Sequence, residues 1–200
     1  MEAKQTRRER KKEETKLRIL NTALELFRRQ GFAATTVDQI TEAADVGKGT
    51  FYNYFGTKEA VIGFYLANEA AKSRKILRPV LHQLPDTKSR LLKAMHSWTR
   101  FVRENRELVR VQMAENFKIY LTMGEADPDK IGFRTFLSEI LNLGQSQGDI
   151  RHDISPEDMG MYLELLFFGP GSWYCAVSED FPLEAKLSEA ISLFLEGAAL

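Results

Sequence analysis

The chain has 200 residues, of which 44% are hydrophobic and 28% charged, a composition that fits an ordinary globular protein and not a disordered one. Its one cysteine, Cys175, excludes an internal disulfide framework, and no apolar run approaches the roughly 18 residues that a membrane span needs. The charged N-terminus also lacks the apolar core of a signal peptide. We therefore expect a cytoplasmic protein that does not enter a membrane.

Basic and acidic side chains are unevenly distributed along the chain. Residues 1–60 contain twelve basic and nine acidic side chains, and the whole chain is neutral, so this part has a charge of +3 and the remainder −3. Such an asymmetry is expected when one end of a protein meets phosphates. The basic residues at the very start predict a mobile, solvated arm at about 1–9, which would add salt-dependent affinity for phosphate.

The first helix is predicted from about Thr6 to Gln30. Apolar side chains such as Leu20 and Leu24 recur in it at spacings of three and four, which places them on one face. Gly31 follows as a natural C-terminal cap, because glycine adopts positive φ without a steric penalty.

Two short helices are predicted next, at 37–44 and 48–55. Thr36 is a good N-cap for the first of them, and Gln39 three residues later completes a capping-box pattern. The turn between the two helices contains Gly47. Two short helices joined in this way form a helix-turn-helix, whose second helix enters the major groove of DNA.

Longer helices are predicted for the rest of the chain. Pro79 is expected to end the first of them, and the run Gly169-Pro170-Gly171 to interrupt or kink the fifth. Asp127-Pro128 and Ser155-Pro156 are helix start signals. The predicted ranges are 58–78, 87–104, 106–121, 128–147, 156–168 and 182–196. Because no stretch shows a strand pattern, we predict an all-α protein.

The second short helix has two different faces. Phe51 and Phe55 are four residues apart, so they share a face that is predicted to pack on the preceding helices. At about 100° per residue, Gly49 and Asn53 point almost the opposite way. Asn53 can offer a donor and an acceptor to an adenine edge, and Thr50 a hydroxyl or a methyl group. Gly49 lets the backbone approach DNA closely.

Other polar groups near this helix are candidates for phosphate contacts. Lys48 and Lys58 are natural partners of phosphate or guanine, and Thr36 can donate its hydroxyl to a phosphate. The main-chain N–H groups near Gly47 add a partial positive charge. The tyrosines are expected either to hold phosphates or, for one of them, to pack in the core. The predicted DNA-contacting set is Thr36, Gly47, Lys48, Gly49, Thr50, Tyr52, Asn53, Tyr54 and Lys58.

One segment of this region resembles the signature of the tetracycline-repressor (TetR) family. The matching run is Ala33-x-x-Thr36-Val37-x-x-Ile40, then Val46-Gly47-Lys48-Gly49-Thr50-Phe51-Tyr52-Asn53-Tyr54-Phe55, then Lys58-Glu59. The segment from Gly148 to Glu157 and the closing Phe194-Leu195-Glu196-Gly197 also resemble turns and endings of such regulators. Gly47 departs from the pattern, because the family often has serine there, and a side-chain phosphate contact is then missing.

The resemblance implies the domain organisation and the partners. It implies a helix-turn-helix domain at 1–56 and a helical effector-binding and dimerisation domain at 57–200, joined through the helix 58–78. A homodimer is also expected because two-fold repetition on a palindromic operator multiplies specificity. We expect a repressor that a small hydrophobic or aromatic effector releases from double-stranded DNA. A co-repressor or an activator stays open.

Apolar residues of the second domain are expected to form an effector cavity and a dimer interface. Aromatic and methionine side chains at helical spacings form core and interface, and some are expected to line an effector cavity. The candidates are Trp98, Phe101, Met113, Phe117, Tyr120, Phe133, Phe136, Tyr162, Phe167 and Trp173. The dimer interface is expected on the last two helices, at Met159, Leu163, Leu166, Leu187, Ala190, Ile191 and Phe194.

Other functions are less well supported by the residues. His152-Asp153 with Glu157 and Asp158 could suggest a metal or an acid–base pair, but acids are expected at a helix start for capping and dipole reasons. Cys175 has no motif context, and the chain has no phosphate-binding glycine loop and no nucleophile elbow. We expect no enzyme, no cofactor and no metal. The rival functions are a sequence-indifferent DNA binder and a ligand-binding protein or enzyme with a vestigial helix-turn-helix.

Overall fold

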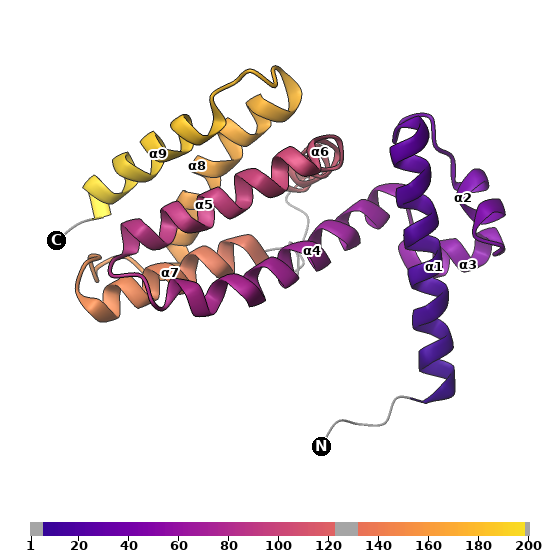
Figure 1. Cartoon of the computed structure of the whole chain (residues 1–200), viewed down its shortest axis with the longest axis horizontal. Helices are drawn as coiled ribbons and strands as arrows, with labels where there is room; N and C mark the ends of the chain where they lie inside the picture. The colour runs from indigo at the N-terminus through magenta and orange to yellow at the C-terminus, as the bar shows by residue number, and fades with distance from the viewer. Residues whose placement is uncertain (1–5, 123–131, 199–200) are drawn as a thin grey trace. The chain divides into compact units, whose positions relative to one another are not determined.

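The structure is a computed structural model that describes the backbone of residues 6–122 and 132–198, and the side chains of these residues except 117–122 and 198. All regular elements in these ranges are α-helices, so the predicted all-α fold class is confirmed (Figure 1). The helix start predicted at Asp127-Pro128 lies outside the described residues. Within the described helices, none is long and apolar enough to cross a membrane.

The chain divides into two compact units, residues 1–65 (the N-terminal unit) and residues 66–200 (the C-terminal unit). The N-terminal unit contains α1 (Arg7–Gln30), α2 (Val37–Ala43), α3 (Lys48–Phe55) and the start of α4 (Lys58–Leu81). The boundary between the units falls inside α4, beyond the boundary at 56 that the resemblance implies. The roles assigned to the two parts remain a proposal.

The helix caps of the N-terminal unit form as the sequence predicts. Thr36 caps α2, and its hydroxyl accepts a hydrogen bond from the Gln39 N–H while the Gln39 side chain accepts one from the Thr36 N–H. Gly31 ends α1 with a φ of 81°. Ile19, Ile40 and Phe51 are fully buried, so α1, α2 and α3 share one core.

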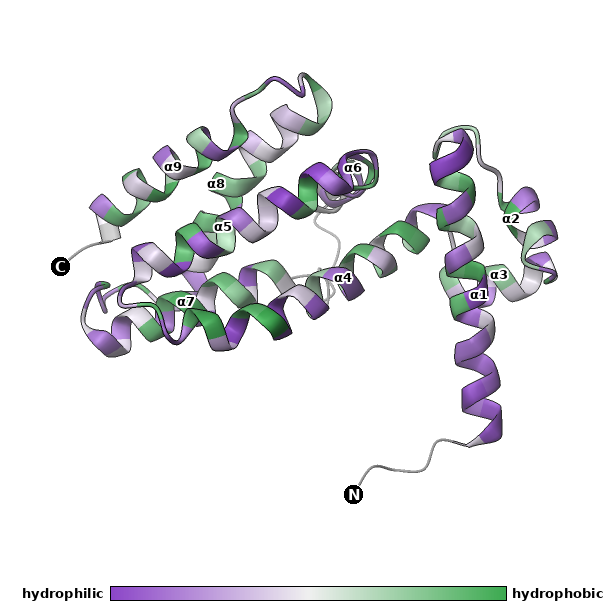
Figure 2. Ribbon diagram, in the orientation of Figure 1, coloured by the Kyte–Doolittle hydropathy of each residue, from purple (hydrophilic) through white to green (hydrophobic). Residues whose placement is uncertain are grey.

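The start of α1 differs from the expected basic arm. Thr6 and Glu9 form a capping box, so residues 7–9 belong to a helix and not to an arm, and residues 1–5 lie outside the described part. Figure 2 shows that the first turns of this helix are hydrophilic throughout, whereas its later turns alternate between hydrophilic and hydrophobic. Only the later turns pack into the core, where the buried residues begin at Ile19.

The C-terminal unit is built around α8 (Pro156–Ala176). This helix packs against α6 (Arg106–Thr122), α7 (Gly132–Gln147) and α9 (Leu183–Ala198), while α5 (Thr87–Glu104) packs on α6, α7 and α9. Close approach between α7 and α8 requires Gly160, because a Cβ there would lie 2.2 Å from the Ser138 hydroxyl.

The predicted helix end at Pro79 and the predicted interruption at Gly169-Pro170-Gly171 are wrong, while a kink at the latter stays a prediction. The helix α4 continues past Pro79 to Leu81, and α8 runs without interruption through Gly169-Pro170-Gly171. A proline removes one helical hydrogen bond, but tertiary packing on both sides outweighs that loss. Near the end of α4, Leu81 is buried and its carbonyl accepts a hydrogen bond from Nε of the fully buried Arg90, at 3.2 Å.

Candidate nucleic-acid interface and ligand-binding core

The inner face of α3 is held by aromatic packing. Phe51 is fully buried and Phe55 is 7% exposed, as the sequence predicts. The two rings lie 6.1 Å apart, and Phe55 also makes an edge contact at 5.7 Å with Phe64 of α4. The Lys16 ammonium lies 3.6 Å from the centre of the Phe64 ring. These contacts fix how α3 is oriented on α1 and α4.

The outer face of α3 is polar and thin. Lys48, Gly49 and Asn53 are exposed, Tyr52 is 53% exposed, and the remaining members of the predicted set on this helix, Thr50 and Tyr54, are half-buried. A Cβ added at Gly47 or at Gly49 would meet nothing within 4 Å. The structure thus places the predicted α3 residues on one accessible surface.

Lys48 is paired with an acidic residue that the sequence analysis did not single out. Its Nζ lies 2.8 Å from Oδ1 of Asp38, and both side chains are largely exposed. The hydrogen bond that the Lys48 ammonium donates to the Asp38 carboxylate, and the negative charge of that carboxylate, raise the pKa of Lys48. The two residues are ten positions apart, so only the geometry of the turn between α2 and α3 shows that they meet.

The Lys58 side chain points towards the loop between α1 and α2. Its ammonium donates hydrogen bonds to the carbonyl oxygens of Phe32 and Thr35, at 2.9 and 3.0 Å, and lies 4.2 Å from the centre of the Phe32 ring. Lys58 therefore ties α4 to the loop that leads into α2.

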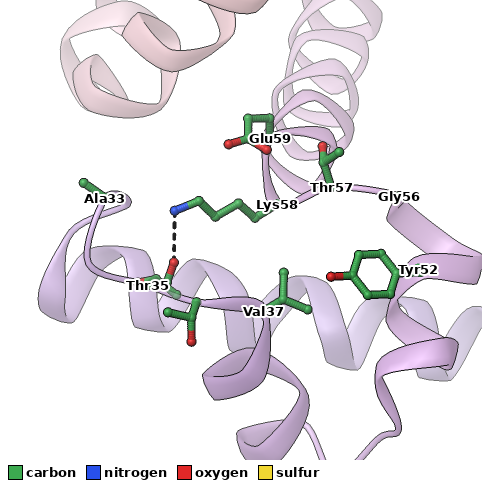
Figure 3. A pocket seen from close by; sticks show the side chains of 9 residues that line it. Ala33, Thr35, Val37, Tyr52, Gly56, Thr57, Lys58 and Glu59 are labelled. Atoms are coloured by element: carbon green, nitrogen blue, oxygen red, sulfur yellow. Dashed lines mark hydrogen bonds between the residues drawn. The ribbon is translucent and has the colours of Figure 1, made fainter.

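A shallow depression of about 360 Å³ surrounds this lysine. Figure 3 shows Lys58 reaching across it towards Thr35, with the Tyr52 hydroxyl directed into it from α3. Thr36 also lines the depression, and because its hydroxyl oxygen already accepts from Gln39, its proton is left to donate. Lys58, Tyr52 and Thr36 thus line the same depression beside α3.

Part of the predicted effector set comes together in the C-terminal unit. Trp98 of α5, Phe133 of α7 and Phe167 of α8 form an aromatic cluster with ring centres 5.4–6.0 Å apart. Met113 of α6 adjoins it: a Cβ at Gly171 would lie 2.6 Å from Trp98 and 2.9 Å from the Met113 methyl. Four helices therefore contribute side chains to one apolar region.

The other predicted effector residues have different positions. Tyr162 and Trp173 are 50% and 56% exposed, on the opposite side of α8 from the buried Phe167, so they do not belong to the cluster. Phe136 is buried and Phe101 half-buried. Phe117 and Tyr120 lie outside the described side chains.

Four of the seven predicted dimer residues are buried within a single chain. Met159, Leu163, Leu187 and Ile191 are at most 1% exposed within a single chain, so they hold α8 and α9 in their own core. Leu166 is 37% exposed, and Ala190 and Phe194 are half-buried. The exposed apolar side chains of these helices are Tyr162, Leu165, Leu166, Trp173 and Leu193.

The acidic turn before α8 has a structural explanation. Asp153 accepts two hydrogen bonds of 2.6 Å from Arg151, and this guanidinium lowers the pKa of the Asp153 carboxyl. Ser155 caps α8, its hydroxyl accepting from the Asp158 N–H at 3.0 Å. The capping interpretation of this segment is confirmed. Among the described residues, no group of three or more histidine, cysteine or acidic side chains could hold a metal ion.

A helix-turn-helix with a polar outer face, followed by a larger helical unit, defines a class of DNA-binding regulators. Residues 19–63 match the family model described as bacterial regulatory proteins, tetR family. The helix-turn-helix of this chain is therefore that of the TetR-family transcriptional regulators, as the sequence motif indicates.

Solved structures extend the likeness to about nine tenths of the chain. FadR of Thermus thermophilus, a TetR-family repressor in complex with lauroyl-CoA, is 29% identical and superimposes with a TM-score of 0.80, over 92% of this chain and 95% of that one. Bacillus subtilis FadR, in complex with stearoyl-CoA, is 17% identical with a TM-score of 0.66, over 90% and 98% of the two chains, and so shows the fold alone.

Curated relatives are also transcriptional regulators. KstR2 of Rhodococcus jostii, a transcriptional repressor, is 27% identical over 192 residues, or 90% of this chain and 89% of KstR2. The uncharacterised regulator YerO of Bacillus subtilis is 30% identical over 107 residues, which cover 52% of this chain and about a third (36%) of YerO. The latter match does not extend to the whole protein.

Proposed function

We propose that this chain is a homodimeric, sequence-specific repressor that a hydrophobic acyl ligand releases from a palindromic operator. The observation that carries the proposal is the outer face of α3, which is polar, accessible and free of bulky side chains at Gly49. An α-helix with such a face fits the major groove, where base edges are read by hydrogen bonds.

The DNA-contacting residues divide by chemistry into two groups. Asn53 and Thr50 read base edges, while Gly49 allows the backbone to come close. Tyr52 and the Thr36 hydroxyl hold phosphates, together with Tyr54 and the main-chain N–H groups that follow Gly47, and Lys48 offers its ammonium to phosphate or to guanine. Lys58 acts mainly as a positioning residue, because its hydrogen bonds to two loop carbonyls hold the start of α2 in place.

Dimerisation is proposed through the exposed apolar side chains of α8 and α9. A surface row of Tyr162, Leu165, Leu166 and Trp173 is unusual for a helix facing water, and Leu193 of α9 is 71% exposed. A second copy related by two-fold symmetry would cover these side chains with the same side chains of its own. The dimer then presents two copies of α3 to the two halves of the operator.

The effector is proposed to be an acyl thioester of coenzyme A. The Thermus thermophilus relative, similar over nearly its whole length, is described with lauroyl-CoA. In this chain Trp98, Phe133 and Phe167 form an apolar cluster that joins α5, α7 and α8, and an acyl chain would pack against these rings. An acyl chain inserted there would favour one arrangement of the helices and shift the population of the dimer away from DNA.

A duplex library with randomised base pairs tests the DNA-binding part of the proposal. The full-length protein should enrich a palindromic sequence, and Asn53→Ala should weaken binding at particular base pairs by about 1–3 kcal/mol each. If the protein enriches no sequence, or if its affinity for enriched and random duplexes is equal, it is a sequence-indifferent binder.

Thermal unfolding tests the effector. Acyl-CoA thioesters of increasing chain length should raise the melting temperature and release the enriched duplex, whereas coenzyme A without an acyl chain should do neither. Free ligand at 100 times its Kd stabilises the folded state by about 2.7 kcal/mol, which is readily measured. If no thioester shifts the melting temperature, the effector class is wrong.

A further inference from the structure

We propose that the Asp38–Lys48 ion pair determines specificity: it recognises one G·C base pair in each half of the operator and weakens binding to unrelated DNA. The inference rests on the proposed function, because it places α3 in the major groove. It adds to the DNA-contacting surface an acidic residue, Asp38, that contacts base and not phosphate.

The pair spans the two helices of the helix-turn-helix. Lys48 is the first residue of α3 and Asp38 lies in the first turn of α2, and Nζ is 2.8 and 2.9 Å from the two carboxylate oxygens. The side chains are 60% and 67% exposed. An ion pair so open to solvent contributes little to folding stability, so the fold does not require it.

The position of the pair is unexpected for a surface that meets phosphates. The Asp38 carboxylate repels phosphate oxygens, and it occupies the ammonium of Lys48, which would otherwise bind any phosphate within reach. On random DNA the pair is therefore unfavourable, because Lys48 must either stay with Asp38 or leave a carboxylate beside the DNA backbone.

A G·C base pair satisfies both members of the ion pair. Guanine presents the acceptors O6 and N7 in the major groove, and its cytosine partner presents the N4 amino donor beside them. The Lys48 ammonium can donate to guanine while the Asp38 carboxylate accepts from cytosine. In an A·T pair the two acceptors are separated by the adenine amino group, so Lys48 meets one acceptor where guanine offers two.

The experiment first enriches a duplex from a randomised library with the full-length wild-type protein. The affinities of full-length variants are then compared on three DNAs: this duplex, versions of it with a single G·C pair changed to A·T, and the unselected library. Near 0.15 M salt, Asp38→Asn should bind the unselected library about fivefold more tightly for each helix-turn-helix that contacts DNA. The slope of log affinity against log salt concentration should be steeper by about one for each of them. Its preference for G·C over A·T should also fall about tenfold at one position, which occurs once in each half of the operator.

Glu42→Gln is the matched control, because it removes the same charge from an exposed position of the same helix, four residues from Asp38. Lys48→Gln leaves α2 unchanged and should lose preference for the same base pair, so a folding defect of Asp38→Asn would not hide the result. Equal effects of Asp38→Asn and Glu42→Gln, or unchanged discrimination in Asp38→Asn and Lys48→Gln, overturn the inference while leaving sequence-specific binding intact. Failure of the wild type to enrich any sequence overturns the proposed function itself.

Discussion

Replacing Gly49 by alanine should stabilise the protein and weaken its binding to DNA. Gly49 has helical backbone in the first turn of α3, and a Cβ there would meet nothing within 4 Å, so alanine fits without strain. Alanine is favoured over glycine in a helix by about 0.5–1 kcal/mol, which sets the expected gain in the free energy of unfolding.

The same methyl group points to where the proposed function places DNA. Inserting a methyl group into a close-packed contact costs about 1–3 kcal/mol. A dimer makes the contact twice, so the operator affinity should fall by a factor of about 25 or more. Thermal unfolding measures the first effect, and fluorescence anisotropy with the enriched duplex measures the second.

Gly197→Ala is the control for this variant. Gly197 also lies in a helix with open space at its Cβ, but in α9 of the C-terminal unit, so alanine there should leave DNA affinity unchanged. If Gly49→Ala binds the operator as tightly as the wild type, the backbone of α3 does not approach DNA closely and the reasoning from the outer face fails.

Three further predictions follow from single contacts. Lys58→Met should lower the free energy of unfolding by about 1–2 kcal/mol, because two loop carbonyls lose a charged donor; unchanged melting with weakened binding to all DNA would instead make Lys58 a phosphate contact. Leu166→Glu should be a monomer in analytical ultracentrifugation. The control Ala185→Glu should remain a dimer, because Ala185 is an exposed residue of α9 outside the apolar set. If Leu166→Glu is also a dimer, the apolar face of α8 and α9 is not the interface. Gly171→Ala should destabilise by about 1–3 kcal/mol and change Trp98 fluorescence, because its Cβ would lie 2.6 Å from the indole; an unaltered emission spectrum would contradict this.

The caps of α1 and α2 were predictable because their signals are local. The capping box of Thr36 and Gln39 and the cap at Gly31 depend on residues within a few positions, so the sequence alone identifies them. The end of α4 depends instead on Arg90, whose guanidinium reaches the carbonyls of Leu81 and Leu84 from a different helix. No pattern within residues 58–81 contains that information.

The inner face of α8 was not predictable for another reason. This helix has apolar side chains on two sides, with Met159, Leu163 and Phe167 inside and Tyr162 and Leu166 outside. Periodicity identifies a helix but does not say which of two apolar faces meets its own core and which remains exposed. Contact with α7 and α9 decides the matter, and those contacts appear only in three dimensions.

The polar residues on the outer face of α3 do little to stabilise this helix. Its first turn contains Gly49, its N-cap Gly47 has no side chain to cap the helix, and eight residues are too few for an isolated helix in water. The helix exists because Phe51 and Phe55 pack into the N-terminal core. Since the packing face supplies the stability, the outer face is free to vary, and a change such as Asn53→Ala can alter which DNA is bound without altering the fold.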